Sequence, residues 1–152
     1  MLQPVDLGPT YYYVEAHAGT PDVKRLSNVV STTIADKGGC FADAGTLCLV
    51  NARFEVRAKW QLAGSSVVTL AHAMPRTDQS GYFWFFTPDN VEVTLKVLNA
   101  CPAAYWVFAS GMTNVGVEIS VRDRKTFRTR TYSNPPGTPF APILDTNAFS
   151  CQ

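Results

Sequence analysis

The sequence predicts an all-β protein, an immunoglobulin-like antiparallel β-sandwich with an N-terminal β-hairpin extension. Residues 53–60, 90–98 and 114–122 each alternate apolar and polar side chains with a period of two, which is the pattern of a strand with one buried face. Valine, threonine and aromatic residues recur throughout, a composition typical of strands. Strands with a single apolar face need a second sheet to cover them, so we expect two packed sheets and no helix of three turns.

Length and charge narrow the class of protein. The chain has 152 residues, enough for one domain or for one domain with an appendage. Charged residues make up 16% and the net charge is +1, which argues against electrostatic binding of nucleic acid. No apolar stretch reaches the roughly 18 residues that cross a bilayer, so we expect no membrane insertion. Residues 1–9 lack the pattern of a secretion signal, which we expect to have been removed or to lie upstream.

Residues 1–35 predict the hairpin extension. Two apolar stretches, at 11–16 and 27–33, flank a turn around residues 19–22. The residues that we assign to hairpin assembly are Tyr11, Tyr12, Tyr13, Val14, Val29 and Val30. Residues 6–34 resemble the last two strands of a fibronectin type III domain, although the spacing is one residue short and the five earlier strands are absent. A lone hairpin is only marginally stable in water, so something must cover its apolar face.

A Gly- and Ala-rich connector at 36–46 precedes the predicted sandwich domain at 47–152. The domain's strands are expected at 53–60, 67–73, 82–86, 90–98, 105–109, 114–122 and 127–132. The tail at 133–152 contains several prolines, which lack the N–H donor that a central strand needs. We expect this tail to wrap across the sandwich, with Phe140, Ile143 and Phe149 as its anchors.

The four cysteines, Cys40, Cys48, Cys101 and Cys151, permit three disulfide connectivities. Cys40 and Cys48 flank a short loop that can bend back on itself, whereas Cys101 ends a strand and Cys151 nearly ends the chain. We therefore expect Cys40 to bond to Cys48 and Cys101 to bond to Cys151. Disulfides favour an oxidising compartment, so we expect a secreted or cell-surface protein.

Residues 40–151 also resemble an uncharacterised β-rich domain that often ends secreted bacterial proteins. The first strand of that domain has a Cys-Leu-x-x-x-Arg-Phe-x-Val-x-x-x-Trp pattern, which corresponds here to residues 48–60. The likeness continues through residues 80–86, 130–135 and 145–149. It implies the architecture and secretion, but no activity.

Candidate catalytic and metal-binding residues are few. No Gly-x-Ser-x-Gly elbow is present, and no Cys-x-x-Cys pair accompanies His17 or His72 to suggest zinc. Three glutamates lie beside Arg or Lys on polar strand faces, where cross-strand ion pairs explain them; they are Glu55, Glu92 and Glu118. Turn formation explains the loop residues Asp78, Asp89, Asn90 and Asp145, with calcium binding as the open alternative. We expect no catalytic residue, metal or cofactor, and no enzyme.

The aromatic strand at 82–86 is apolar on both faces. Either the proline-rich tail covers its outer face, or that face is an exposed patch that stacks on sugars or docks another chain. Trp60, Trp84 and Trp106 are the candidate ligand platform. The basic cluster at 122–130 is expected to be a solvated sheet face, with binding to an acidic polymer as the alternative.

The open edges of the hairpin invite strand addition to a neighbouring chain. We therefore expect a non-enzymatic extracellular structural or interaction module, and specifically a self-assembling surface-layer or filament subunit whose partners are copies of itself. The alternative is a carbohydrate-binding accessory domain of a secreted protein, with a polysaccharide as partner. A third interpretation is that the chain is a fragment of a larger secreted protein.

Overall fold

The computed structural model describes residues 10–12, 15–18, 23–26, 30–32 and 39–152. The chain divides into two compact units, Met1–Lys37 and Gly38–Gln152. No helix occurs among the described residues, and none of them forms a helical segment that could span a membrane. The boundary between the units lies within the predicted connector.

The described residues of the first unit form two antiparallel ladders. Strand β1 (Thr10–Tyr12) pairs with β4 (Val30–Thr32), and β2 (Glu15–Ala18) pairs with β3 (Val23–Leu26). The predicted hairpin extension is therefore present, although its returning strand begins before residue 27. Among the residues assigned to hairpin assembly, Tyr11, Tyr12 and Val30 lie on β1 and β4. Tyr13, Val14 and Val29 lie outside the described residues.

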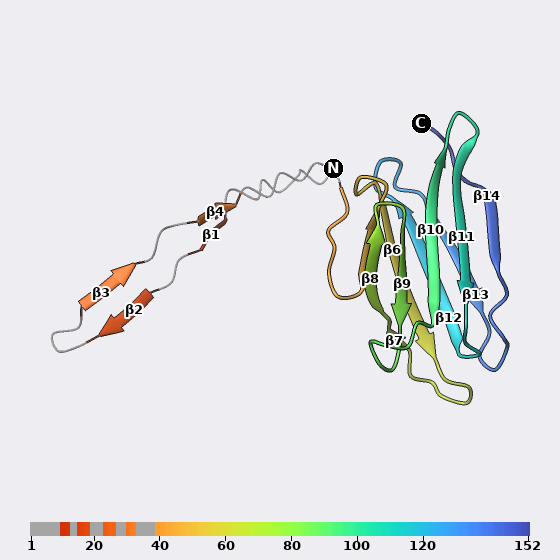
Figure 1. Ribbon diagram of the computed structural model, residues 1–152, viewed down its shortest axis with the longest axis horizontal. Helices are drawn as coiled ribbons and strands as arrows, with labels where there is room; N and C mark the ends of the chain where they lie inside the picture. Colours follow the sequence, from red (N-terminus) through yellow and green to blue (C-terminus); the bar gives the residue numbers. More distant parts are fainter. Residues whose placement is uncertain (1–9, 13–14, 19–22, 27–29, 33–38) are drawn as a thin grey trace, which may run out of the picture. The chain divides into compact units, whose positions relative to one another are not determined.

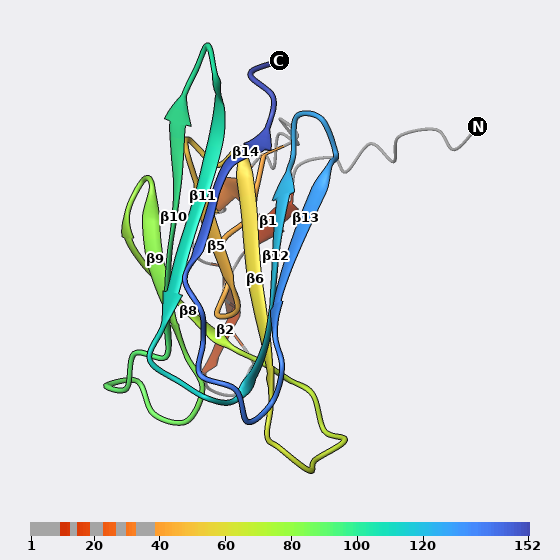
Figure 2. The same ribbon diagram turned by 90° about the vertical axis from the view of Figure 1, so that its right-hand side faces the viewer.

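The second unit is a sandwich of two antiparallel sheets, which Figures 1 and 2 show as separate layers. Its ten strands are β5 (Thr46–Leu49), β6 (Phe54–Gln61), β7 (Thr69–Leu70), β8 (His72–Thr77), β9 (Ser80–Trp84), β10 (Val93–Ala100), β11 (Ala104–Gly111), β12 (Gly116–Asp123), β13 (Thr129–Asn134) and β14 (Ile143–Phe149). One sheet, here the β6 sheet, has the order β13-β12-β6-β5, with β7 also paired to β6. The other, the β10 sheet, has the order β14-β11-β10-β9-β8. The predicted all-β antiparallel sandwich is confirmed.

The core lies between the two sheets and consists of the apolar faces that alternation predicted. Phe54, Val56 and Ala58 of β6 are fully buried. The same holds for Val93 and Val97 of β10. The charged residues between them point outward, so each sheet has one apolar face that the other sheet covers.

Residues 48–60 do not form one strand, as the resemblance implied. The chain reverses between β5 and β6, and Leu49 pairs with Phe54. The reversal uses three consecutive positive φ angles, 55°, 53° and 58° at Val50, Asn51 and Ala52. The backbone N–H of Asn51 donates to Asp78 Oδ1 at 2.8 Å and holds the turn from the β8–β9 loop. The turn contains neither Gly nor Pro, and Asn51 is its one residue of a type that tolerates the left-handed conformation.

The predicted connector and the predicted tail both form part of the sandwich. In the connector, Cys40 N–H donates to the carbonyl of Ala52 at 2.7 Å, and the carbonyl of Ala44 accepts from Ala73 N–H at 2.8 Å. The tail does not simply wrap across the sandwich, because its second half forms β14 at the edge of the β10 sheet, beside β11. The predicted anchors do pack as expected: Phe140 and Phe149 are buried, and Ile143 packs against the core.

Side chains join the two sheets where edge strands β13 and β14 meet. Arg130 Nε donates to the carbonyl of Ala148 at 2.9 Å, and the Tyr132 hydroxyl donates to Asp145 Oδ2 at 2.8 Å. Burial and this hydrogen bond raise the pKa of Tyr132 above its ordinary value. On the opposite side, Val50 N–H donates to the carbonyl of Asp78 at 2.6 Å. Both long sides of the sandwich are thus tied together, which protects its edge strands.

Candidate functional site

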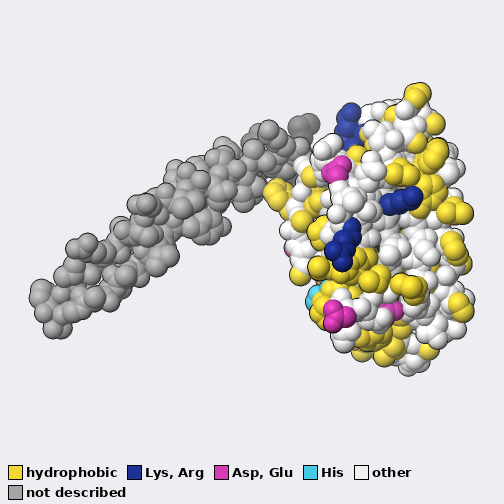
Figure 3. Space-filling model, in the orientation of Figure 1, with side chains coloured by type: hydrophobic (Ala, Val, Ile, Leu, Met, Phe, Trp, Pro, Cys, Tyr) yellow, Lys and Arg dark blue, Asp and Glu magenta, His cyan; other side chains and the backbone are white. Residues whose placement is uncertain are grey.

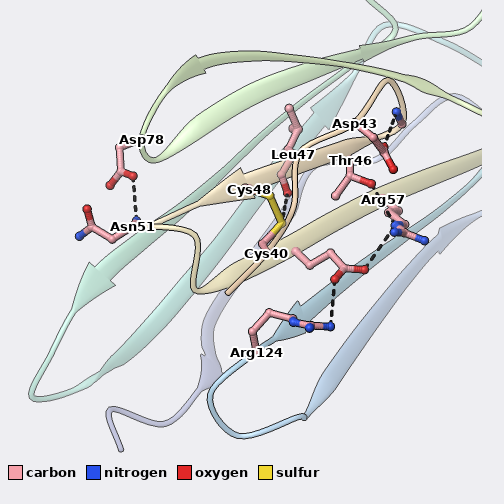
Figure 4. Close-up of a disulfide and its surroundings, with 11 residues drawn as sticks. Cys40, Asp43, Thr46, Leu47, Cys48, Asn51, Arg57, Asp78 and Arg124 are labelled. Carbon is pink, nitrogen blue, oxygen red and sulfur yellow. Dashed lines mark hydrogen bonds and ion pairs between the residues drawn. A yellow bond between two sulfur atoms is a disulfide. The ribbon is translucent and has the colours of Figure 1, made fainter. Parts of the chain in front are cut away.

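Two disulfides close the sandwich unit in the pairing that we predicted. Cys40 is bonded to Cys48 with their Cα atoms 5.5 Å apart, and Cys101 is bonded to Cys151 with their Cα atoms 5.7 Å apart. Figure 4 shows the first bond beside β5. The pair of bonds fits an oxidising compartment.

A charged cluster links the two sheets at one end of the core. Arg53 Nε and Nη2 donate to the two carboxylate oxygens of Asp123 at 3.0 and 2.8 Å, and Nη1 donates to the Tyr105 hydroxyl at 2.9 Å. Asp123 is fully buried, and it also accepts bonds from the Lys125 N–H and the Thr126 hydroxyl. Burial by itself would raise the pKa of Asp123, but these hydrogen bonds outweigh burial and hold that pKa below its ordinary value. Because every oxygen and cation here is paired within the chain, this cluster is structural.

The glutamates fall into two groups. Glu55 contacts Arg57 and Arg124, both at 3.3 Å, and Glu118 lies 3.9 Å from Lys59. Figure 4 shows Arg57 and Arg124 in this network. Glu92 differs from the prediction, because it is buried and accepts a hydrogen bond from Asn90. Within the described ranges, no group of three or more His, Cys, Asp or Glu side chains is arranged to hold a metal ion.

The outer face of the β10 sheet carries most of the half-exposed aromatic side chains. Phe83 and Phe85 point into the core, so the alternate residues Tyr82 and Trp84 point outward and are half-buried. The alternate residues of β11, Trp106 and Phe108, are also half-buried on this face. The proline-rich tail joins the sheet at its β14 edge and leaves the face open: Leu144 of β14 is 73% exposed. Of the two interpretations of the aromatic strand, the structure therefore favours the exposed patch.

A hollow of about 380 Å³ lies in the middle of this face. Small residues form part of its floor: Thr94 of β10 lies opposite Ser110 of β11, and Ser80 of β9 lies one outward position along, opposite Lys96. Tyr82 and Phe108 form parts of its two sides. In Figure 3 the face is turned toward the viewer, with isolated basic side chains among yellow and white atoms.

Each of the two aromatic rings beside the hollow has a cation over it. The guanidinium of Arg76 lies 5.0 Å from the centre of the Tyr82 ring, and Lys96 Nζ lies 5.3 Å from the centre of the Phe108 ring. Such distances are those of cation–π contacts. In the described part of the chain, neither Arg76 nor Lys96 has an acidic partner. No local sequence pattern marks these two cations, because only the strand register places them at one hollow.

The three tryptophans of the predicted platform do not share one face. Trp60 points toward the core and stacks on Phe85, with ring centres 5.6 Å apart. Trp84 and Trp106 both lie on the outer face, and all three indoles are half-buried. The indole N–H groups of Trp60 and Trp106 are buried without an acceptor. The platform is thus reduced to Trp84 and Trp106.

His72 is exposed and stacks on Trp84, with ring centres 3.8 Å apart and planes 10° apart. This contact at the β8 edge extends the aromatic surface. His17 lies on β2, and the structure describes only its backbone. The basic cluster at 122–130 is partly engaged within the chain, through Arg124 and Arg130.

No family model, curated protein or solved structure matches this chain. The resemblances to the secreted bacterial domain and to fibronectin type III strands therefore remain predictions.

Proposed function

We propose that the protein is a non-enzymatic extracellular interaction module and that its binding surface is the outer face of the β10 sheet. The observation that supports this proposal is the concentration of half-exposed rings on that face, beside apolar side chains such as Met74 and Leu144, which are 40% and 73% exposed. Soluble domains use contiguous apolar surface mainly for binding. Aromatic rings beside polar groups suit a binding interface that has an apolar centre and a hydrated polar rim.

Secretion or display at a cell surface is part of the same proposal. The two disulfides indicate an oxidising compartment, and the resemblance of residues 40–151 to a domain of secreted bacterial proteins agrees with it. Binding is favoured over catalysis because the groups that converge on the face are rings, hydroxyls and cations.

The test is retention of the purified full chain on insoluble extracellular material from its source. We expect wild type to be retained, and Phe108→Ser with Leu144→Ser to be retained several-fold less, because both side chains contribute apolar contact area. The matched control is Phe41→Ser, since Phe41 is 59% exposed but lies in the segment leading to β5 of the other sheet. Equal retention of the face variant and wild type would contradict the proposal.

Self-assembly by strand addition is a second candidate function. Its support is that β1 to β4 form two-stranded ladders in a unit separate from the sandwich, and such ladders have edges that can pair with another chain. Light scattering at increasing protein concentration tests it. We expect the full chain to associate and a chain starting at Gly38 to stay monomeric. A monomeric full chain at high concentration excludes this function.

A further inference from the structure

We propose that the hollow on the outer face of the β10 sheet binds an acidic sugar, namely a uronic-acid unit of a polysaccharide. This inference rests on the proposed function and names the ligand class of the same surface. It depends on four side chains, Arg76, Tyr82, Lys96 and Phe108, and on the small hydroxyl residues between them.

Strand register places these groups together. Lys96 lies opposite Ser80 of β9 on one side and opposite Phe108 of β11 on the other. Tyr82 lies opposite Thr94, one outward position along the same strands. Arg76 is at the β8 edge, two strands from Lys96, so their backbones are roughly 10 Å apart at the usual strand spacing. That separation suits a ligand of two linked sugar rings.

The hollow is lined by two cations, Arg76 and Lys96, so it favours an anionic ligand. Within the described part of the chain, Arg76 and Lys96 each lie over an aromatic ring, and Arg76 also forms a 3.5 Å hydrogen bond to the Tyr82 hydroxyl, but neither has a carboxylate partner. By contrast, Arg53, Arg57 and Arg124, which belong to the other sheet and its turns, each pair with a carboxylate of the chain. A carboxylate on the ligand would supply the partner that these two cations lack, as a charge-assisted hydrogen bond.

The remaining groups favour a sugar over an acidic peptide. The floor offers the hydroxyls of Ser80, Thr94 and Ser110, and the Thr94 hydroxyl donates to a backbone carbonyl at 3.3 Å while keeping lone pairs for a ligand. Tyr82 and Phe108 supply apolar ring surface for the C–H groups of a pyranose. The volume of about 380 Å³ is within the range of small-ligand sites. An acidic peptide would also find the cations, but its widely spaced backbone amides match the hydroxyl floor less fully than the adjacent hydroxyls of a sugar ring do.

The experiment measures binding of the full chain to polygalacturonate, to its fully methyl-esterified form, and to polyglutamate by titration calorimetry. We expect binding to polygalacturonate that weakens as salt screens the charges, and at least a tenfold weaker interaction with the neutral ester and with polyglutamate. Arg76→Gln and Lys96→Gln should each lower the affinity for polygalacturonate by roughly five- to tenfold, the loss of one charge-assisted contact. Lys125→Gln is the control, because Lys125 is exposed in the β12–β13 turn. This variant should bind polygalacturonate as tightly as wild type does.

Three results overturn the inference: no binding to polygalacturonate, equal binding to the ester or to polyglutamate, or equal loss in the Lys125 control. Circular dichroism of each variant distinguishes a lost contact from a lost fold. If polygalacturonate fails but retention on the source's extracellular material still depends on Phe108 and Leu144, only the sugar assignment is lost. If both experiments fail, the proposed function is lost with it.

Discussion

Val50, Asn51 and Ala52 adopt a conformation that L-residues disfavour, because the left-handed region brings Cβ close to the backbone. Ala52 has the largest of the three angles, with φ 58°. We predict that Ala52→Gly raises the free energy of unfolding by about 1 kcal/mol, since glycine removes the Cβ conflict. Urea unfolding followed by tryptophan fluorescence measures it.

The matched control for Ala52→Gly is Gly64→Ala. Gly64 has φ 76° with open space around its Cβ position, so only backbone strain should change, and stability should fall by a similar amount. A destabilised Ala52→Gly would mean that the turn is not strained.

The Arg53–Asp123 pair gives a second prediction at this scale. Removing one charge of a buried pair leaves the other uncompensated, so Asp123→Asn should cost roughly 3 to 5 kcal/mol of unfolding free energy at pH 7. The pKa of Asp123 is lowered in the folded protein. The ionised carboxylate of Asp123 therefore stabilises the folded protein fully at pH values above about 3.9, the pKa of Asp in the unfolded chain. This stabilisation is lost as the pH falls from there through the lower pKa of the folded protein.

Urea titrations of wild type and Asp123→Asn at pH 7, 4 and 3 measure this effect. The stability difference between the two proteins should shrink as the pH falls. Asp89→Asn, in the exposed loop before β10, should track wild type throughout. A difference that is independent of pH would contradict the role of the ionised carboxylate.

Among the elements, β14 depends on a disulfide because it lies at a sheet edge. Cys101–Cys151 closes 50 residues and Cys40–Cys48 closes 8. Loop entropy then predicts losses of about 4 and about 2.5 kcal/mol when each pair is replaced by serine. We expect the Cys101→Ser and Cys151→Ser variant to be the less stable one and its β14 amides to exchange fastest. Equal losses in the two variants, or unchanged exchange in β14, would refute this.

Alternation identified the elements that have one buried face and missed those defined by other features. It predicted β6, β10 and β12, whose inward positions include Val56, Val93 and Ile119. It missed β14, because prolines just before the strand suggested a wrapping tail. The single strand across residues 48–60 was implied by the family resemblance, and alternation argues against it, because the inward positions change from Leu47 and Leu49 to Phe54 and Val56 across the turn.

For the whole molecule, the candidate site was only partly predictable. The aromatic strand at 82–86 was recognised as apolar on both faces, and its outer residues do lie on an open surface. Arg76 and Lys96 could not be assigned to that surface, because nothing local to either residue specifies the register of β8, β9 and β10. The disulfides were predictable, since loop length restricts which cysteines can meet.

The division into two units leads to a final prediction about the molecule as a whole. The features that stabilise the sandwich, namely its apolar core, both disulfides and the Arg53–Asp123 pair, all lie within Gly38–Gln152. A unit with its own core can fold alone. A chain starting at Gly38 should therefore unfold in urea at the same midpoint and with the same m-value as the sandwich transition of the full chain, measured by tryptophan fluorescence. All three tryptophans lie in this unit, so the signal reports on it alone. A lower midpoint for the shorter chain would mean that residues 1–37 stabilise the sandwich, and the hairpin would then be a structural part of the domain instead of a segment available to other chains.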